Sequence, residues 1–145
     1  DIAHSRVARS NIPGLCKMGA HVSVAGPATM IPRDIEKMGV RSYTRIEEAI
    51  RDADIIMMLR IQTEREHQSI FPSLREYAQF FSLNRRNIDL ASKEVLIMHP
   101  GPINRGVEIS PEIADGPRSI ILDQVTNGVA VRMALLYLLT GGGNP

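Results

Sequence analysis

The spacing of apolar and polar residues along the chain predicts helices and strands in alternation. Apolar residues recur with helical spacing over residues 6–19, although Pro13 lacks an N–H and should kink this helix or delay its regular part. Residues 20–25 alternate in the manner of a strand, and Gly26-Pro27 ends the run. The further expected elements are helices over residues 32–38, 46–53, 73–81 and 127–140, and strands over residues 54–59, 94–98 and 119–122.

Two of the expected strands are continuous apolar runs, DIIMML at residues 54–59 and EVLIM at residues 94–98. Such runs are typical of parallel strands that are covered on both faces. The alternation of strands and helices therefore predicts an α/β domain: a three-layer, Rossmann-like open parallel sheet with helices on both faces. Thr44 is the expected N-cap of the helix that follows it, with Glu47 completing a capping box. Ser73, or Ser69 just upstream, is the expected cap of the helix over residues 73–81.

Composition narrows the possible functions. The 145 residues fit one domain, 43% of them are hydrophobic and 4% aromatic, so the core should be mainly aliphatic. The net charge of +1 gives no general attraction to nucleic acid or to an acidic membrane, and neither partner is expected. The longest apolar stretch, residues 129–139, contains Arg132 and is far shorter than a membrane span. With no signal peptide evident, a cytoplasmic location is expected.

Several kinds of chemistry lack their usual sequence signals. The chain has one cysteine, Cys16, and four histidines without metal-ligand spacing. It contains no GxGxxG, no GxxxxGK[ST] phosphate loop and no nucleophile-elbow motif. Neither a cofactor nor a metal is therefore expected, and any anion must be bound by a few placed arginines.

Arg60 and Gln62 follow the apolar run at residues 54–59. Ligands of open parallel sheets bind at the carboxyl ends of the strands, which makes Arg60 a candidate binding residue. In an extended chain residues 60 and 62 point to the same side, so a guanidinium and an amide would meet one ligand. Arginine suits a carboxylate because it can donate two parallel hydrogen bonds. The segment alone leaves open the alternative of a solvated arginine at a strand end.

Arg6 lies at the start of the first expected helix, in the segment HSRVARSN at residues 4–11. The first turn of a helix has free backbone N–H groups and a dipole that favours anions. Arg6 is therefore a second candidate for an anionic ligand. An ordinary residue at a helix start remains the alternative interpretation.

The segment MHPGPINRGVEIS, residues 98–110, follows the second apolar run as a stiff loop. Pro100 and Pro102 flank Gly101, so three successive residues offer three carbonyl groups and only one N–H. This pattern favours a ligand whose amide NH₂ must be oriented, although a rigid turn at the end of the sheet would also explain it. His99 is a weaker candidate for a general acid or base, because no partner carboxylate is evident nearby in the sequence.

Four segments, in this order, resemble the second half of the aspartate carbamoyltransferase family. They are HSRVARSN at residues 4–11, LRIQTER at residues 59–65, MHPGPINRGVEIS at residues 98–110 and QVTNGVAVRMALL at residues 124–136. The related ornithine carbamoyltransferases typically carry His-Cys-Leu-Pro where this chain has His-Pro-Gly-Pro. The resemblance therefore implies aspartate as the amine substrate.

The resemblance implies roles for five residues. Arg6 and Arg60 correspond to arginines that bind the two carboxylates of L-aspartate, and Gln62 to a glutamine that helps to seat it. Gly101 and Pro102 correspond to backbone that contacts the carbamoyl group of carbamoyl phosphate, with a cis peptide bond before the proline. No catalytic residue is assigned within this half.

The resemblance also implies the context of the chain. Residues 1–145 correspond to the carboxy-terminal aspartate-binding domain, preceded in the family by a strand before Asp1 and by an amino-terminal carbamoyl phosphate domain. The implied activity is transfer of the carbamoyl group from carbamoyl phosphate to L-aspartate in pyrimidine biosynthesis. The implied assembly is a homotrimer of catalytic chains, and regulatory chains or another pyrimidine enzyme are further partners that the family allows.

Two other hypotheses remain open from the sequence. The chain could be a non-catalytic binding or regulatory module on a carbamoyltransferase-like scaffold, which would place it outside the enzymes. It could also belong to a carbamoyltransferase that acts on another amino acid.

Overall fold

Parallel strand pairs form the centre of the domain in the computed structural model, which describes residues 2–61 and 73–141. The strands of these residues are β1 (Ser23–Ala25), β2 (Arg41–Tyr43), β3 (Ile55–Met57) and β4 (Leu96–Met98). β1 pairs with β2, and β3 pairs with β4, with Ile56 opposite Ile97.

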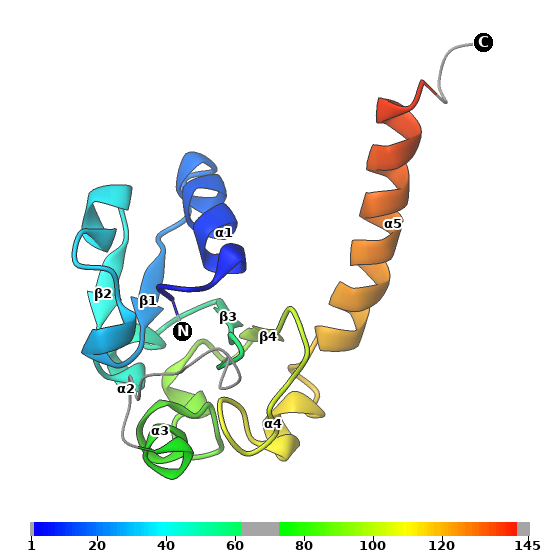
Figure 1. Cartoon of the computed structure of the whole chain (residues 1–145). Helices are drawn as coiled ribbons and strands as arrows, with labels where there is room; N and C mark the ends of the chain where they lie inside the picture. Colours follow the sequence, from blue (N-terminus) through cyan, green and yellow to red (C-terminus); the bar gives the residue numbers. More distant parts are fainter. Residues whose placement is uncertain (1, 62–72, 142–145) are drawn as a thin grey trace.

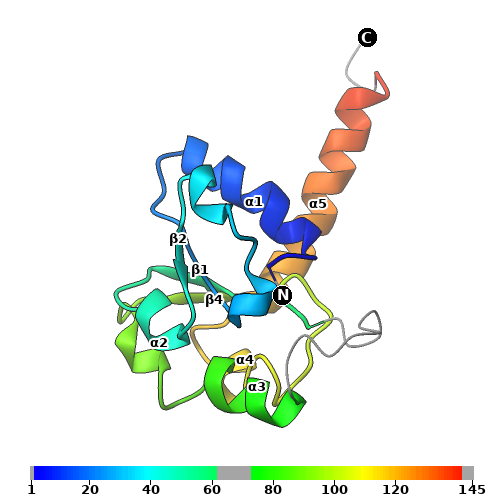
Figure 2. The same ribbon diagram turned by 60° about the vertical axis from the view of Figure 1, so that its left-hand side comes forward.

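Helices lie on both sides of these strands. The α-helices are α1 (Arg6–Lys17), α2 (Ile46–Ala49), α3 (Leu74–Phe81), α4 (Pro111–Ala114) and α5 (Ile121–Leu139). Short 3₁₀ helices are η1 (Ala28–Met30), η2 (Ile35–Met38) and η4 (Ile88–Leu90). In Figures 1 and 2, α1 lies on one side of the strands and α2 and α3 lie on the other. The predicted α/β class, with parallel strands between helices, is confirmed.

The largest apolar cluster surrounds β3 and β4. Val95 and Ile97 are completely buried in it, as are Leu83 and Ile109 from later segments. The predicted apolar runs therefore supply the core, although the assigned strands are only three residues long. A second cluster packs α1 against β1 through Ala8, Ile12 and Val24, and it includes the half-buried Leu59.

The strand expected over residues 119–122 is wrong for most of its length. Ser119 makes only an isolated parallel bridge to Ile97. The Ile97 N–H donates to the Arg118 carbonyl at 2.8 Å, and the Ile120 N–H donates back to the Ile97 carbonyl at 2.9 Å. Helix α5 begins directly afterwards at Ile121, six residues before the predicted start at residue 127. The bridge ends so early because the backbone of residue 121 already belongs to the helix.

Pro13 does not delay the first helix. Ser5 caps α1, because its Oγ accepts a hydrogen bond from the Ala8 N–H at 3.1 Å. The helix therefore begins at Arg6 and continues to Lys17 with Pro13 inside it. A proline at this position lacks the N–H that would otherwise bond one turn back, and the cap and the buried face hold the turn that precedes it.

The other expected caps have different outcomes. Ser73 caps α3 by accepting a hydrogen bond from the Glu76 N–H at 3.1 Å. The capping box expected at Thr44 does not form. Helix α2 begins one residue later than that box requires, with Arg45 at the cap position and no side-chain cap bond. Glu47 then occupies the second helical position rather than the third, where a capping-box carboxylate belongs.

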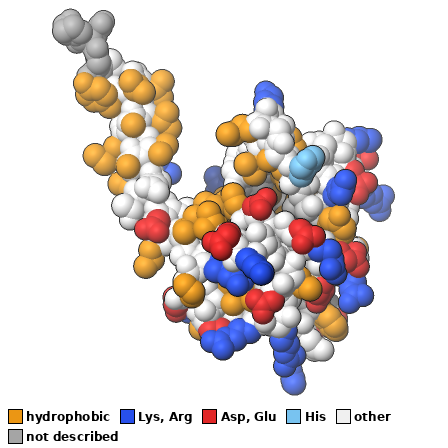
Figure 3. Space-filling view, turned by 180° about the vertical axis from the view of Figure 1, so that it is seen from behind, with side chains coloured by type: hydrophobic (Ala, Val, Ile, Leu, Met, Phe, Trp, Pro, Cys, Tyr) orange, Lys and Arg blue, Asp and Glu red, His pale blue; other side chains and the backbone are white. Residues whose placement is uncertain are grey.

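Helix α5 extends away from the rest of the domain and carries apolar side chains on its exposed surface (Figures 1 and 3). Most of the exposed large hydrophobic residues belong to it: Leu122, Val125, Val129, Val131, Met133, Leu135, Leu136, Tyr137, Leu138 and Leu139. Despite this apolar surface, neither α5 nor another helix of the described segments has both the length and the hydropathy of a membrane span. An exposed apolar surface of this size is typical of an interaction site.

Candidate functional site

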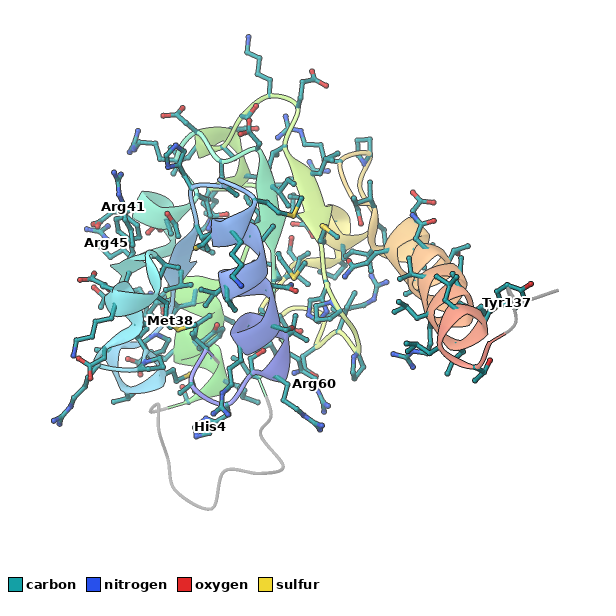
Figure 4. All side chains as sticks on the ribbon, turned by 90° about the horizontal axis from the view of Figure 1, so that it is seen from above. His4, Met38, Arg41, Arg45, Arg60 and Tyr137 are labelled. Carbon is teal, nitrogen blue, oxygen red and sulfur yellow. The ribbon has the colours of Figure 1, made fainter. Side chains whose placement is uncertain are left out.

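Arg60 lies three residues beyond the carboxyl end of β3. The side chain is half-buried, its Nε atom is buried, and the residue takes part in an interaction within the domain. Figure 4 shows Arg60 at the same end of the molecule as His4, which immediately precedes the start of α1. The partial burial argues against the alternative of a fully solvated arginine at a strand end.

A short series of contacts brings the start of the chain toward Arg60. The Ala3 N–H donates to the Met30 carbonyl at 3.0 Å. The Met30 side chain is completely buried and packs with the buried Ile61, the residue after Arg60. Arg6, the first residue of α1, is exposed and lies three residues beyond Ala3. The contacts thus place the segments of Arg6 and Arg60 at one end of the domain.

Helix α1 also contacts β3 directly. Asn11, near its middle, approaches Met57 with its Nδ2 atom 3.2 Å from the sulfur. Leu59, next to Arg60, packs against the same cluster as α1. The convergence of Arg6 and Arg60 on one ligand remains a prediction, and Gln62 lies outside the described residues.

Gly101 and Pro102 are exposed at the tip of the loop that follows β4. The peptide bond between them is cis, as expected. Gly101 has a φ of +69°, a conformation that glycine adopts with little strain. The tip thus presents backbone groups to the surface.

The loop after β4 is tied to the segment after β3. Asn104 Nδ2 donates a hydrogen bond to the Ile61 carbonyl at 3.1 Å. This bond joins residues 43 positions apart, from two separate sequence motifs. The bond ties the segment that carries Arg60 to the loop that carries Gly101 and Pro102.

Sequence reasoning missed the partner of His99. Its imidazole Nε2 lies 3.2 Å from Glu108 Oε1, and both side chains are completely buried. Glu108 Oε1 also accepts a hydrogen bond from the Asn104 N–H at 2.6 Å. Glu108 belongs to the same motif, but it lies nine positions after His99 in an irregular loop, so no helical or strand spacing signals the contact.

A surface ion pair joins the loop after β4 to the residue that follows α4. Arg105 donates two hydrogen bonds to Asp115, at 2.5 and 2.8 Å, in the parallel geometry that arginine forms with carboxylates. The bonds with Asp115 raise the pKa of Arg105, and the bonds with Arg105 lower the pKa of Asp115. Both side chains are exposed, so the pair contributes orientation more than stability.

Tyr77 of α3 is buried in the cluster of Met30 and Ile61, against which Val107 of the loop packs. Burial, together with the negative charge of Glu108, raises the pKa of the Tyr77 hydroxyl well above its usual range. The ring packs beside Phe81, with centroids 5.2 Å apart. The buried Glu108 carboxylate thus lies near an apolar cluster that contains the phenol of Tyr77.

A cavity of about 440 Å³ lies where β4 ends and α5 begins. Met98, Gln124 and Arg132 are among the residues that line it. Gln124 Oε1 also accepts a hydrogen bond from the His99 N–H at 3.0 Å, so the first turn of α5 reaches the same loop. The cavity therefore adjoins the start of the loop through Gln124.

The polar groups of this region are suited to binding a ligand and fixing its orientation. Arginines can bind carboxylates, and the backbone carbonyls of the loop tip can accept hydrogen bonds from an NH₂ group. In residues 2–61 and 73–141, no group of three or more His, Cys, Asp or Glu side chains is arranged to hold a metal ion.

Comparison with known sequences identifies relatives over nearly the whole chain. Residues 1–139 match the family described as aspartate/ornithine carbamoyltransferase, Asp/Orn binding domain. The aspartate carbamoyltransferase catalytic subunit of Syntrophus aciditrophicus is 75% identical over 99% of this chain and 47% of its own length. That of Pelotomaculum thermopropionicum is 62% identical over 99% of this chain and 46% of its own length. The chain thus spans about half the length of the curated relatives it matches.

Solved structures agree in fold. Ornithine carbamoyltransferase from Pyrococcus furiosus superposes with a TM-score of 0.77 and 25% identity, over 93% of this chain and 46% of that one. Aspartate transcarbamoylase from Trypanosoma cruzi, in complex with phosphate, superposes with a TM-score of 0.62 and 24% identity, over 80% of this chain and 40% of that one. The second likeness supports the fold alone.

Proposed function

The chain belongs to the aspartate/ornithine carbamoyltransferase family, and on that premise we propose that it is the aspartate-binding half of an aspartate carbamoyltransferase. The complete enzyme transfers the carbamoyl group of carbamoyl phosphate to the amino group of L-aspartate. The products are N-carbamoyl-L-aspartate and phosphate, in pyrimidine biosynthesis. High identity to two relatives named aspartate carbamoyltransferase catalytic subunit supports this choice of substrate.

One contact carries the proposal: the hydrogen bond from Asn104 Nδ2 to the Ile61 carbonyl. It joins the segment that presents Arg60 to the loop that presents Gly101 and Pro102. An amine substrate held by the first segment would therefore meet an acceptor group held by the second. Fixing two reactants in this way makes their reaction effectively unimolecular.

In this proposal Arg6 and Arg60 each bind one carboxylate of L-aspartate, and Gln62 helps to seat the same molecule. Two separated guanidinium groups define the orientation of a small diacid better than one. Each charge-assisted hydrogen bond contributes roughly 1.5–3 kcal/mol. The half-buried position of Arg60 supports this role, because partial removal from water strengthens such bonds.

Gly101 and Pro102 act through their backbone. Their carbonyl groups accept hydrogen bonds from the NH₂ of the carbamoyl group and so turn its carbon toward the aspartate amine. The uncharged amine attacks this carbon, the bond to the phosphate oxygen breaks, and phosphate leaves with the proton that the amine nitrogen loses. No covalent bond to the protein forms in this sequence of steps.

The rest of the site belongs to an amino-terminal half, which supplies the phosphate-binding groups. The exposed apolar surface of α5 and the twofold greater length of the relatives support such a partner. In the complete protein this half covers α5 and closes the cavity beside β4. A cytoplasmic homotrimer of such chains, open to regulatory chains or another pyrimidine enzyme, completes the proposal.

An amine-substrate comparison tests the proposal. The full-length chain that contains these residues is assayed with carbamoyl phosphate and either L-aspartate or L-ornithine. Carbamoylation of aspartate with little or no ornithine reaction is expected. Reaction with ornithine would assign another amine to the site, and no reaction with either would favour a non-catalytic module on the same scaffold.

A further inference from the structure

His99, the first residue after β4, is held inside the protein through its main-chain N–H and both ring nitrogens. Its main-chain N–H donates to Gln124 Oε1 at 3.0 Å. Its Nδ1 accepts a hydrogen bond from the Gly101 N–H at 2.9 Å. Its Nε2 lies 3.2 Å from Glu108 Oε1, and the whole side chain is buried. A ring fixed at both nitrogens has one orientation.

These contacts determine the tautomer of the imidazole. The Gly101 N–H can only donate, so Nδ1 carries no proton when it accepts this bond. The ring proton is then on Nε2 and is donated to the Glu108 carboxylate. Both ring nitrogens of His99 are thus engaged within the protein and its side chain is buried, which argues against the hypothesis that His99 exchanges a proton with a substrate.

Glu108 holds the loop at two places through one oxygen. Its Oε1 accepts from His99, at the start of the loop, and from the Asn104 N–H at 2.6 Å, two residues past Pro102. Its main-chain carbonyl accepts from the Leu83 N–H at 2.9 Å, which fixes Glu108 to the segment after α3. The position of the Gly101–Pro102 tip thus depends on the carboxylate of Glu108, a residue that is itself fixed by the bond from the Leu83 N–H.

Stability alone does not explain a buried acid at this place. Glu108 Oε2 is buried without a hydrogen-bond partner among residues 2–61 and 73–141, which costs free energy. Apolar residues of similar volume are often at least as stabilising as a buried polar pair. Buried polar networks do, however, impose one specific arrangement on the groups they hold.

We propose that Glu108 is a positioning residue for carbamoyl transfer. Through His99 and the Asn104 N–H it sets the position of the Gly101–Pro102 backbone against the carbamoyl group. Its role is to supply an acceptor oxygen at one fixed point. This inference rests on the proposed function, since it assumes that the loop tip contacts the carbamoyl group.

Two substitutions of Glu108 in the full-length enzyme separate position from charge. Glu108→Gln can place an amide oxygen where Oε1 stands and so keep both bonds, at the loss of the charge. Glu108→Asp keeps the charge but withdraws the carboxylate by one methylene. A displacement of about 1 Å in a positioning group can cost roughly 100-fold in rate.

The expected result is a fall in kcat of about 10- to 100-fold for Glu108→Asp, with KM for aspartate changed by less than about threefold. Glu108→Gln should retain kcat within about fivefold. The control is Ser110→Ala, which removes a buried hydroxyl that makes no hydrogen bond with the described residues and should leave both constants unchanged.

The opposite ranking would overturn the inference: an active Asp variant beside an impaired Gln variant would mean that charge, not position, is required. An Asp variant with wild-type kcat would overturn it too, as would a rise in the aspartate KM equal to the fall in kcat. These outcomes require an active wild-type enzyme. An inactive wild type would instead refute the proposed function.

Discussion

Asn104 and Ile61 meet across 43 residues, where the Asn104 side-chain amide donates to the Ile61 main-chain carbonyl at 3.1 Å. The bond joins the segment after β3 to the loop after β4. Ile61 is completely buried, so the carbonyl belongs to a fixed part of the domain. The relative position of Arg60 and the Gly101–Pro102 tip depends on this contact.

Asn104→Ala should therefore affect both stability and substrate binding. The loss of the bond leaves the Ile61 carbonyl without this donor, and the free energy of unfolding should fall by about 1–2 kcal/mol. The aspartate KM of the full-length enzyme should rise, because the Arg60 segment loses its attachment to the loop. Urea denaturation and aspartate kinetics measure the two effects.

Asn84→Ala is the matched control for this prediction. The Asn84 side chain accepts from the Arg86 N–H and donates to the Ser82 carbonyl, both within its own turn. Its replacement should lower stability without a change in aspartate KM. Equal KM values for the two variants would show that the contact with Ile61 does not position Arg60.

Arg60→Ala should lower kcat/KM for aspartate in the full-length enzyme, with a higher aspartate KM and slower turnover. The fall should correspond to a loss of about 2–4 kcal/mol of transition-state stabilisation. The reason is the loss of one guanidinium–carboxylate interaction. Arg41→Ala is the control, because Arg41 is an exposed arginine of β2 far from Arg60 in Figure 4. Steady-state kinetics that are the same for both variants would refute the assigned role of Arg60.

The raised pKa of Tyr77 predicts a loss of folding stability in alkaline solution. Its raised pKa means that the folded protein keeps the phenol proton above about pH 10, whereas the unfolded chain releases it. The unfolded state then binds fewer protons, so stability falls as pH rises, by up to about 1.4 kcal/mol per pH unit.

The measurement is urea denaturation of wild type and Tyr77→Phe between pH 9 and pH 11. The Phe variant keeps the packing beside Phe81 and removes the titrating group. Its stability should decline less steeply with pH than that of the wild type. Parallel declines would show that Tyr77 ionises equally in the folded and unfolded chains.

Polar substitutions on the exposed surface of α5 should improve the solution behaviour of the 145-residue chain and destabilise the full-length chain. Replacement of Val131 and Leu135 by Gln removes apolar surface that is more than half exposed here. The variant of the 145-residue chain should aggregate less, while the full-length variant should be less stable because these side chains are then buried. Thermal unfolding and light scattering measure both effects.

Met18→Gln is the control for the α5 substitutions, because Met18 is 84% exposed at the end of α1 and lies outside the proposed contact. It should leave the full-length stability unchanged. An α5 variant that is as stable as the wild type at full length would show that no other part of the protein covers this helix.

Local signals in the sequence predicted the elements that depend on local physics. Helix α3 begins after Ser73 because a serine there can accept a backbone hydrogen bond, and the apolar runs around Ile56 and Ile97 form the core. Thr44 failed as a cap because tertiary packing starts α2 one residue later, with Ile46 buried. Local propensity does not resolve such a shift.

Long-range contacts were beyond the reach of pattern analysis. The contact between His99 and Glu108 forms within an irregular loop, where no periodicity relates the two positions. The exposure of α5 is equally invisible, since an apolar helix predicts burial without saying against what. The candidate residues Arg6, Arg60, Gly101 and Pro102 came from motifs, and the structure adds the contacts that connect their segments.

The most direct test of the central claim is a crystal structure of the full-length enzyme with succinate, an unreactive analogue of aspartate, in the presence of carbamoyl phosphate. We predict that the Arg6 guanidinium lies within hydrogen-bond distance of one succinate carboxylate and the Arg60 guanidinium within that distance of the other. Succinate bound without contact to either arginine would contradict the account.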